Sequence, residues 1–205
     1  MGQRWRAHRY LKYFFLDDLD HVRHIPIGRL GRVQIAVTPT VWLQLPFFFG
    51  LGLALTFLPG RLPLGTVLAA RIADALTFTV AGLLANTLHG LGHVVTGTLA
   101  GSPMDELLLT STRDANIYRG DQSAIRSRTH IARASGGPLA NLVSAGLAFA
   151  LLRVVGGGQH PYLARIAGLN LAFGLGALLP LPSVDGEVIW RELWRGWRGR
   201  VASRG

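Results

Sequence analysis

The sequence predicts an all-α polytopic membrane protein with about four transmembrane helices and short β-strands at the membrane surface. Of its 205 residues, 49% are hydrophobic and only 16% are charged, and the mean hydropathy is +0.32. This composition is typical of a small membrane protein rather than of a soluble domain. Four long apolar stretches, each near the length that a helix needs to cross a bilayer, lead to the same fold class.

The net charge of +10 does not indicate a nucleic-acid-binding protein. The basic residues flank the apolar stretches instead of lining one face, and the sequence carries no nucleic-acid-binding motif. Contacts with lipid headgroups explain them better. Because the chain has no cysteine, any metal ion must be held by histidine, aspartate or glutamate.

Residues 1–40 are expected to form a basic arm that lies on the membrane surface and ends in a short strand. Aromatic side chains stand among the arginines of this arm, as they do in interfacial segments. The β-branched stretch QIAVT at residues 34–38 predicts the strand. A plain extended linker explains this stretch about equally well.

The transmembrane core is expected to occupy residues 41–186. Its four spans are predicted at residues 41–58, 64–99, 136–155 and 162–179. The second stretch is longer than the ~20 residues that a bilayer requires, so part of it is expected to be tilted, bent or separately helical. The polar residues 101–133 are expected to form a loop outside the membrane with one or two short strands.

Residues 187–205 are expected to form an amphipathic helix that lies along the membrane. Trp190, Trp194 and Trp197 recur at helical spacing with arginines between them, which is typical of an interfacial helix. Basic residues concentrate in the N-terminal arm, in the loop between the second and third spans, and in this last helix. The positive-inside rule therefore predicts a multi-pass protein of the plasma (cytoplasmic) membrane with both termini in the cytoplasm.

Two histidines, His89 and His93, stand four residues apart within the second apolar stretch. On a helix, side chains at this spacing lie on one face, so both rings can bind one metal ion. Hydrogen bonds from the two rings to neighbouring helices explain the pair about equally well. A metal site would need at least one further protein ligand from elsewhere in the chain.

Three stretches together resemble the site-2 protease family of intramembrane zinc metalloproteases: HGLGHVVTGTLAG, GGPLANL and LLPLPSVDG. The resemblance extends from about residue 35 to residue 185. It implies that zinc is held by His89, His93 and Asp185, and that transmembrane segments are cleaved within the membrane. The position of Asp185 supports this role, because an ionisable residue beside a broken helix at membrane depth usually has a function. The alternative is that Asp185 caps the C-terminal helix.

Two residues depart from the family pattern. Gly90 stands where the family has its general-base glutamate, and Ala177 stands where it has an asparagine. A general base contributes ~10²–10⁴-fold to a rate and an oxyanion donor ~10²–10³-fold, so peptide hydrolysis is expected to be impaired. The sequence offers other carboxylates but places none of them near the metal: Asp74, Glu106 and Glu187.

The favoured prediction is therefore a zinc-binding protein of site-2 protease type that cleaves peptides poorly and binds transmembrane segments as a regulator or scaffold. The alternative is an active intramembrane protease with a non-standard general base. A channel or transporter is less well supported, because the sequence has neither paired repeats nor a chain of ionisable residues across its spans. The expected partners are the lipid bilayer and a transmembrane substrate or partner protein, with no nucleic acid.

Overall fold

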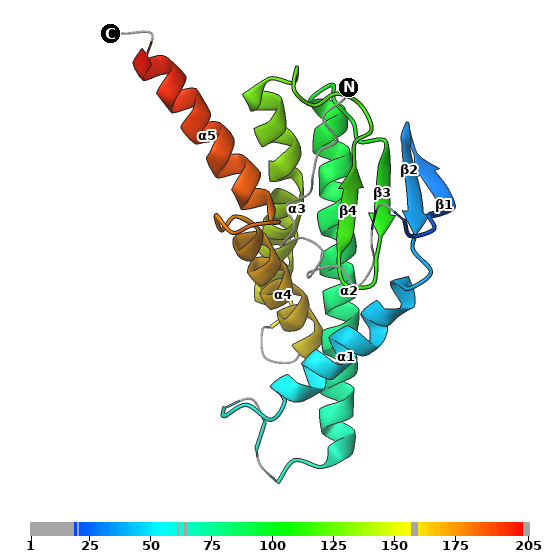
Figure 1. Ribbon diagram of the computed structural model, residues 1–205. Coiled ribbons are helices and arrows are strands. Elements are labelled where there is room, and N and C mark those ends of the chain that lie inside the picture. The colour runs from blue at the N-terminus through cyan, green and yellow to red at the C-terminus, as the bar shows by residue number, and fades with distance from the viewer. Residues whose placement is uncertain (1–18, 20, 61, 64, 157–159, 203–205) are drawn as a thin grey trace.

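The computed structural model describes residues 19, 21–60, 62, 63, 65–156 and 160–202, with the side chains of residues 199–202 left aside. Residues 1–18 and 20, about half of the predicted N-terminal arm, therefore lie outside the described residues. The described chain is mostly helical (Figure 1). Its helices are α1 (Gln44–Leu55), α2 (Leu68–Leu99), α3 (Ser127–Val154), α4 (Pro161–Ala177) and α5 (Asp185–Ala202).

A four-stranded sheet accompanies the helices, and the short strands expected from the sequence belong to it. The strands are β1 (Ile25–Leu30), β2 (Val33–Val37), β3 (Glu106–Leu109) and β4 (Asp114–Ile117), in that spatial order. β1 and β2 form one antiparallel hairpin and β3 and β4 form another, while β2 and β3 pair in parallel. The predicted strand at residues 34–38 is thus β2, and the loop at residues 101–133 supplies two strands.

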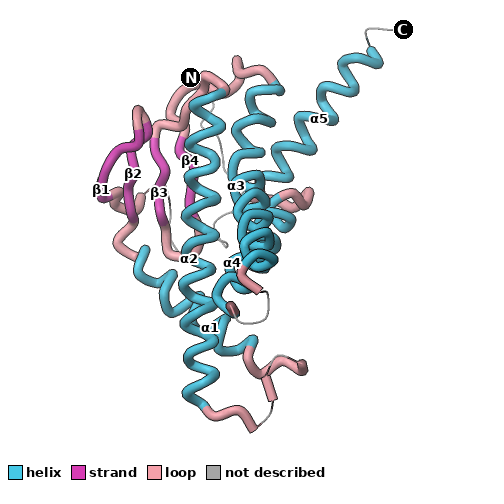
Figure 2. Tube along the Cα trace, turned by 180° about the vertical axis from the view of Figure 1, so that it is seen from behind, coloured by secondary structure: helices cyan, strands magenta, loops and turns pink. Residues whose placement is uncertain are grey.

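The sheet packs against α2 through one of its faces. Side chains alternate between the faces of a strand, and Leu107 accordingly joins Val33, Val94 and Met104 in a buried cluster between sheet and helix. The next residue, Leu108, packs in a separate cluster on the opposite face. Figures 1 and 2 show α2 between the sheet on one side and α3 and α4 on the other.

Helix α2 is one continuous helix of 32 residues, so of the three expected alternatives for this stretch a separate helix at its start is excluded. The two charged residues near that start are accommodated within the helix. Arg71 is buried and donates hydrogen bonds to the carbonyl oxygens of Thr56 at 2.5 Å and Pro63 at 2.9 Å. Asp74 forms an ion pair with Arg165 of α4. These contacts fix the beginning of α2 to its surroundings.

Helices α2 and α3 approach each other closely at a pair of glycines. A Cβ atom added to Gly92 would collide with the backbone of Gly136, and one added to Gly136 would collide with the backbone of Gly92. Small residues therefore allow this contact, as expected for membrane helices. Helix α3 begins at Ser127, nine residues before the predicted start at residue 136, because its first two turns extend beyond the apolar stretch.

Among the described helices, α2 and α3 are long and apolar enough to cross a membrane, judged by length and composition. At ~1.5 Å per residue, α1 with 12 residues and α4 with 17 residues are shorter than the ~30 Å hydrocarbon core. The four-span topology therefore stays a prediction. Exposed apolar side chains at positions spaced by four follow one face of α3, which suits contact with lipid: Leu139, Val143, Leu147 and Leu151.

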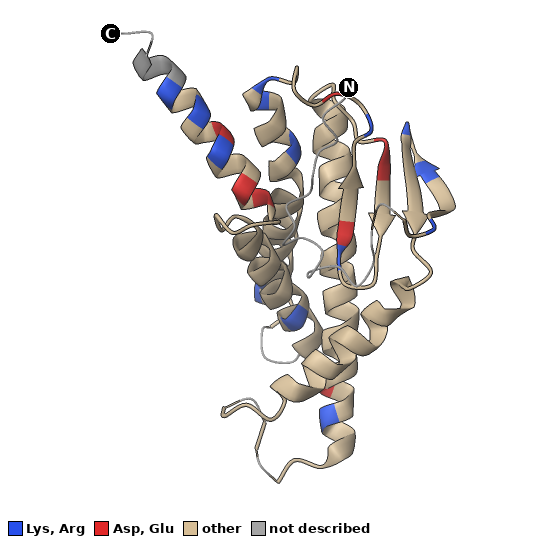
Figure 3. Ribbon diagram, viewed as in Figure 1, with Lys and Arg blue, Asp and Glu red and all other residues tan. Residues whose placement is uncertain are grey.

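Charged residues are unevenly distributed over the molecule. Figure 3 shows many of them in the half that contains the sheet and α5, whereas α1 carries none. The predicted C-terminal amphipathic helix is α5, which begins at Asp185, two residues before the expected start. Its tryptophans at positions 190, 194 and 197 are about half exposed, as an interfacial helix requires.

Candidate metal centre

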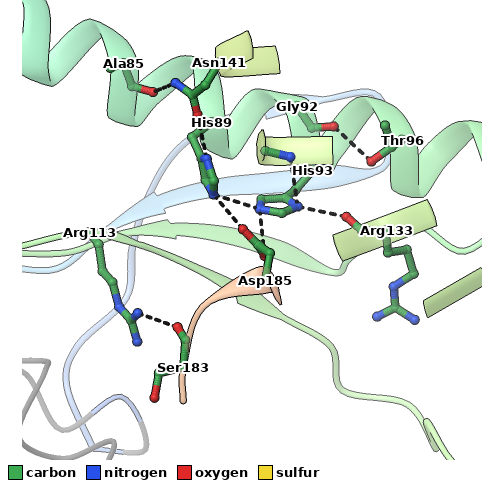
Figure 4. A network of polar contacts seen from close by, with 11 residues as sticks. Ala85, His89, Gly92, His93, Thr96, Arg113, Arg133, Asn141, Ser183 and Asp185 are labelled. Carbon is green, nitrogen blue, oxygen red and sulfur yellow. Dashed lines mark hydrogen bonds and ion pairs between the residues drawn. The ribbon is translucent and has the colours of Figure 1, made fainter. Parts of the chain in front are cut away.

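The structure brings the three predicted ligands together (Figure 4). His89 and His93 extend from one face of α2, and Asp185 reaches them from the first residue of α5. The two imidazole Nε2 atoms are 3.2 Å apart. The Asp185 carboxylate lies 3.0 Å from Nε2 of His89 through Oδ2 and 3.3 Å from Nε2 of His93 through Oδ1.

Helix α3 fixes the orientation of both rings. Nδ1 of His89 lies 2.7 Å from Oδ1 of Asn141, and Nδ1 of His93 lies 2.8 Å from the carbonyl oxygen of Arg133. Because a carbonyl oxygen can only accept, Nδ1 of His93 carries the hydrogen. The backbone N–H of Gly137 is more distant, 3.4 Å from this Nδ1. With Nδ1 as donor in both rings, each Nε2 presents a lone pair to the common centre.

The two interpretations of the histidine pair, hydrogen bonding to a neighbouring helix and metal binding, are compatible in this geometry. The Nδ1 atoms hydrogen-bond to the neighbouring helix, and the Nε2 atoms remain available for a metal ion. Ligand atoms ~2.0–2.1 Å from a tetrahedral zinc ion are about 3.3 Å apart, which matches the observed separations of 3.0 to 3.3 Å. Two neutral imidazoles and one carboxylate therefore fit a divalent ion such as zinc.

Gly137 of α3 leaves the space that the two Nε2 atoms need. A Cβ atom at this position would lie 2.5 Å from Nε2 of His93 and closer still to Nε2 of His89. Such contacts are shorter than van der Waals distances, so no side chain fits here without displacing the rings. The sequence stretch GGPLANL thus contributes both the open space and the Asn141 amide.

Asp185 is directed at the histidines by the loop that precedes α5. Ser183 in this loop has a φ of 71°, and its carbonyl oxygen accepts a hydrogen bond of 2.6 Å from Arg113. The Ser183 N–H donates to the Glu187 carboxylate at 2.9 Å. The side chain that accepts a backbone hydrogen bond at the start of α5 is therefore Glu187, whereas the Asp185 carboxylate faces the histidines. Trp190 donates to the Leu178 carbonyl oxygen at 2.9 Å and ties α5 to the end of α4.

The other carboxylates considered from the sequence are engaged away from the metal centre. Asp74 pairs with Arg165. Glu106 is buried, pairs with Arg119, and lies 2.8 Å from Nδ1 of His24. Glu187 contacts Ser183 and Arg191, which lie four residues before and after it.

Position 177 also lacks the amide of the family pattern. Ala177 is the last residue of α4 and has no polar side chain. Two turns earlier on the same helix, buried Asn170 accepts a hydrogen bond of 2.9 Å from Asn141. The asparagine that α4 does carry therefore supports His89 indirectly, through Asn141.

A carboxylate that sequence reasoning missed lies beside Gly90. A Cβ atom at Gly90 would be 2.7 Å from Oδ2 of Asp114 and 3.2 Å from the methyl carbons of Leu107. Oδ1 of Asp114 accepts a hydrogen bond of 3.0 Å from Asn86, whereas buried Oδ2 has no hydrogen-bond partner among the described residues. Nothing in the local sequence signals this position, because only the pairing of the strands brings Asp114 to α2.

The burial of Asp114 changes its acidity. Burial raises the pKa of this carboxyl to about 7, although the amides of Asn86 and Gln44 favour the ionised form. The nearby Gln44 amide donates to the Thr110 carbonyl oxygen at 2.6 Å. Asp114 is therefore close to the midpoint of its titration at neutral pH.

Comparison with solved structures supports the resemblance found in the motifs. The chain is similar to a site-2 protease from Methanocaldococcus jannaschii, with a TM-score of 0.57 and 18% sequence identity over 84% of this chain and 72% of the other. No protein-family model and no curated protein sequence matches it. At this identity the likeness concerns the fold, and for the fold the predicted resemblance is confirmed.

Proposed function

We propose that this chain, which has a site-2 protease-like fold, is a membrane metallopeptidase that hydrolyses peptide bonds within transmembrane segments. The observation that carries the proposal is the convergence of two Nε2 atoms and one carboxylate on a common point. One zinc ion would be held there by His89, His93 and Asp185. Zinc suits the site because it accepts nitrogen and oxygen donors in a tetrahedral arrangement.

When bound, such an ion polarises a scissile carbonyl group and lowers the pKa of a water molecule. The residues of the chain prepare the site for this chemistry. Asn141 and the Arg133 carbonyl oxygen hold the two imidazoles in the tautomer that binds metal. Gly137 keeps the space between the rings open. The apolar faces of α2 and α3 suit a substrate that is itself a transmembrane segment.

A second candidate function is the regulator or scaffold expected from the sequence, which would bind zinc and transmembrane segments without cleaving them. Gly90 and Ala177 favour it, because neither supplies the group that the family pattern has at that place. The Asp114 carboxylate, which lies beside Gly90, supports hydrolysis instead. Both candidates place the protein in a membrane. We propose the plasma membrane, with several spans and both termini in the cytoplasm.

Metal analysis of purified protein, combined with cleavage of single-span substrates in liposomes, tests the proposal. We expect about one zinc ion per chain in the wild type, none in His93→Ala, and cleavage that His89→Ala abolishes. His130→Ala is a matched control, because the His130 ring lies within hydrogen-bonding distance of the Gln122 carbonyl oxygen, at 3.3 Å, and is not among the three candidate ligands. Stoichiometric zinc in His93→Ala would reject the metal site. Zinc without cleavage in the wild type would select the second candidate.

A further inference from the structure

We propose that Asp114, which reaches α2 from strand β4, is the general base of this site and takes the place of the carboxylate that Gly90 cannot supply. The inference rests on the proposed hydrolytic function. It assigns the proton-transfer role to a residue outside the histidine helix.

The Asp114 carboxylate lies in the space that a side chain at position 90 would enter. Oδ2 lies 2.7 Å from the place that a Cβ atom of residue 90 would occupy. In a glutamate, standard bond lengths put the carboxyl oxygens about 3 Å from their own Cβ. The Asp114 carboxylate is thus as near to this point of α2, one residue after His89, as a glutamate carboxylate at position 90 would be. Because the carboxylate fills this space, a side chain at residue 90 would displace it.

The surroundings of Asp114 leave one oxygen free to accept a proton. Asn86 lies one turn before Gly90 on the same face of α2 and holds Oδ1 at 3.0 Å. Oδ2 is buried and has no hydrogen-bond partner among the described residues. An unsatisfied buried polar atom is costly in a folded protein and is often found where function requires it. A ligand in the site, such as water, would satisfy it.

The acidity of Asp114 matches this role. Burial raises its pKa to about 7, and a general base is most effective when its pKa is near the working pH. The groups facing it are the Asn86 amide and His93 from α2 and the Gln44 amide from α1. His93 is the titratable one among them.

The β3–β4 turn connects Asp114 to the loop that carries the third ligand. Its neighbour Arg113 donates to the Ser183 carbonyl oxygen at 2.6 Å, two residues before Asp185. On the other side of the turn, Thr110 donates its hydroxyl to the Arg113 carbonyl oxygen at 2.5 Å. The hairpin is therefore held against both α2 and the metal-binding loop, which fixes the base relative to the ligands.

The proposed step is balanced in atoms and charge. The oxygen of a water molecule attacks the scissile carbonyl carbon, and the Asp114 carboxylate accepts one of the water protons. Asp114 then gives this proton to the amide nitrogen as the C–N bond breaks. The products are a carboxylic acid, which contains the water oxygen and ionises in solution, and a free amine. Asp114 returns to its ionised form.

The first test removes the charge and keeps the shape. Asp114→Asn should lower the cleavage rate ~10²–10⁴-fold and leave the zinc content unchanged. The wild-type rate should fall as the pH drops below about 7, and the variant should lose this dependence. Asp105→Asn is the matched control, because exposed Asp105 contacts the Arg119 N–H at the far end of the hairpin. Its rate should equal that of the wild type.

The second test relocates the carboxylate to helix α2. Gly90→Glu alone should not increase cleavage, because its Cβ atom would collide with Asp114. Asp114→Ala should abolish most cleavage, and the double variant Gly90→Glu/Asp114→Ala should regain part of it. No gain in the double variant, with zinc still bound, would contradict the equivalence of the two positions.

A third measurement needs neither metal nor activity. In the metal-free protein, Gly90→Ala should lower the melting temperature more in the wild type than in the Asp114→Ala background, although Leu107 keeps some of the clash. Gly168→Ala is the control, since no atom lies within 4 Å of its added Cβ, and Asp114→Ala should not alter its effect. Additive effects of Gly90→Ala and Asp114→Ala would overturn the geometry on which the inference depends.

The outcomes separate the inference from the proposed function. Undiminished cleavage by Asp114→Asn, together with its loss in His89→Ala, would overturn the role of Asp114 and leave the hydrolytic function standing. A wild type that binds zinc and cleaves none of the substrates would overturn both.

Discussion

Replacing Asn141 should weaken metal binding without touching a metal ligand. Asn141 is fully buried, and its Oδ1 accepts the Nδ1 hydrogen of His89 at 2.7 Å. Its Nδ2 donates to the Ala85 carbonyl oxygen and to Oδ1 of Asn170, both at 2.9 Å. In Asn141→Leu, a side chain of similar volume removes all of these hydrogen bonds. His89 is then free to move its hydrogen to Nε2, which would point the hydrogen at the metal.

The magnitude follows from these contacts. Loss of a hydrogen-bond partner behind a metal-binding histidine lowers metal affinity ~10–100-fold, which equals about 1.4–2.7 kcal/mol. Stability should fall as well, because each buried partner left unsatisfied costs about 1–3 kcal/mol. By contrast, Asn141→Asp should keep the affinity, since a carboxylate accepts the same Nδ1 hydrogen and forms the usual carboxylate–histidine–metal arrangement.

The assay is competition for zinc against a chelator of known affinity, followed by denaturant unfolding of the metal-free protein. Ser144→Ala serves as control, because the Ser144 hydroxyl donates a hydrogen bond within α3, to the Ala140 carbonyl oxygen at 2.7 Å. Its affinity should equal that of the wild type. An affinity of Asn141→Leu within twofold of the wild type would show that Asn141 does not orient the His89 ring, and the tautomer assigned to His89 would have to be abandoned.

Three further predictions concern the space beside Gly137, the buried Asp114 carboxyl group and the membrane topology. Gly137→Ala should abolish zinc binding, because its methyl group would occupy the space between the two Nε2 atoms, whereas Gly146→Ala on the same helix meets no atom within 4 Å and should bind zinc normally. Burial raises the pKa of Asp114 to about 7, compared with ~3.9 for an unfolded chain. The folded protein should therefore lose up to about 4 kcal/mol as the pH rises from about 4 to about 7. Asp114→Asn should remove this loss in denaturant titrations of the metal-free protein, and parallel pH profiles of variant and wild type would refute it. A topology reporter fused at Pro59 should report the outer side of the membrane; a cytoplasmic signal there would contradict the four-span arrangement.

The sequence by itself predicted the helices and the three residues of the candidate metal centre. Apolar composition predicted a membrane protein, and the i, i+4 spacing of His89 and His93 is a local property that any regular helix converts into a shared face. The break at PLPSVDG located Asp185 ahead of the last helix. Helix boundaries were less accurate, as at Ser127, because polar residues continue a helix beyond the apolar stretch that predicts it.

Only the tertiary structure decided which groups surround the histidines. Asp114 comes next to Gly90 because β3 pairs in parallel with β2, whose partner residues lie about seventy positions away in the chain. Asn141 meets His89 because two glycines let α3 approach α2 closely. Such contacts depend on strand register and helix packing, which the order of residues near Asp114 or Asn141 does not reveal. The sequence therefore showed a missing carboxylate at Gly90, and the fold placed one beside it.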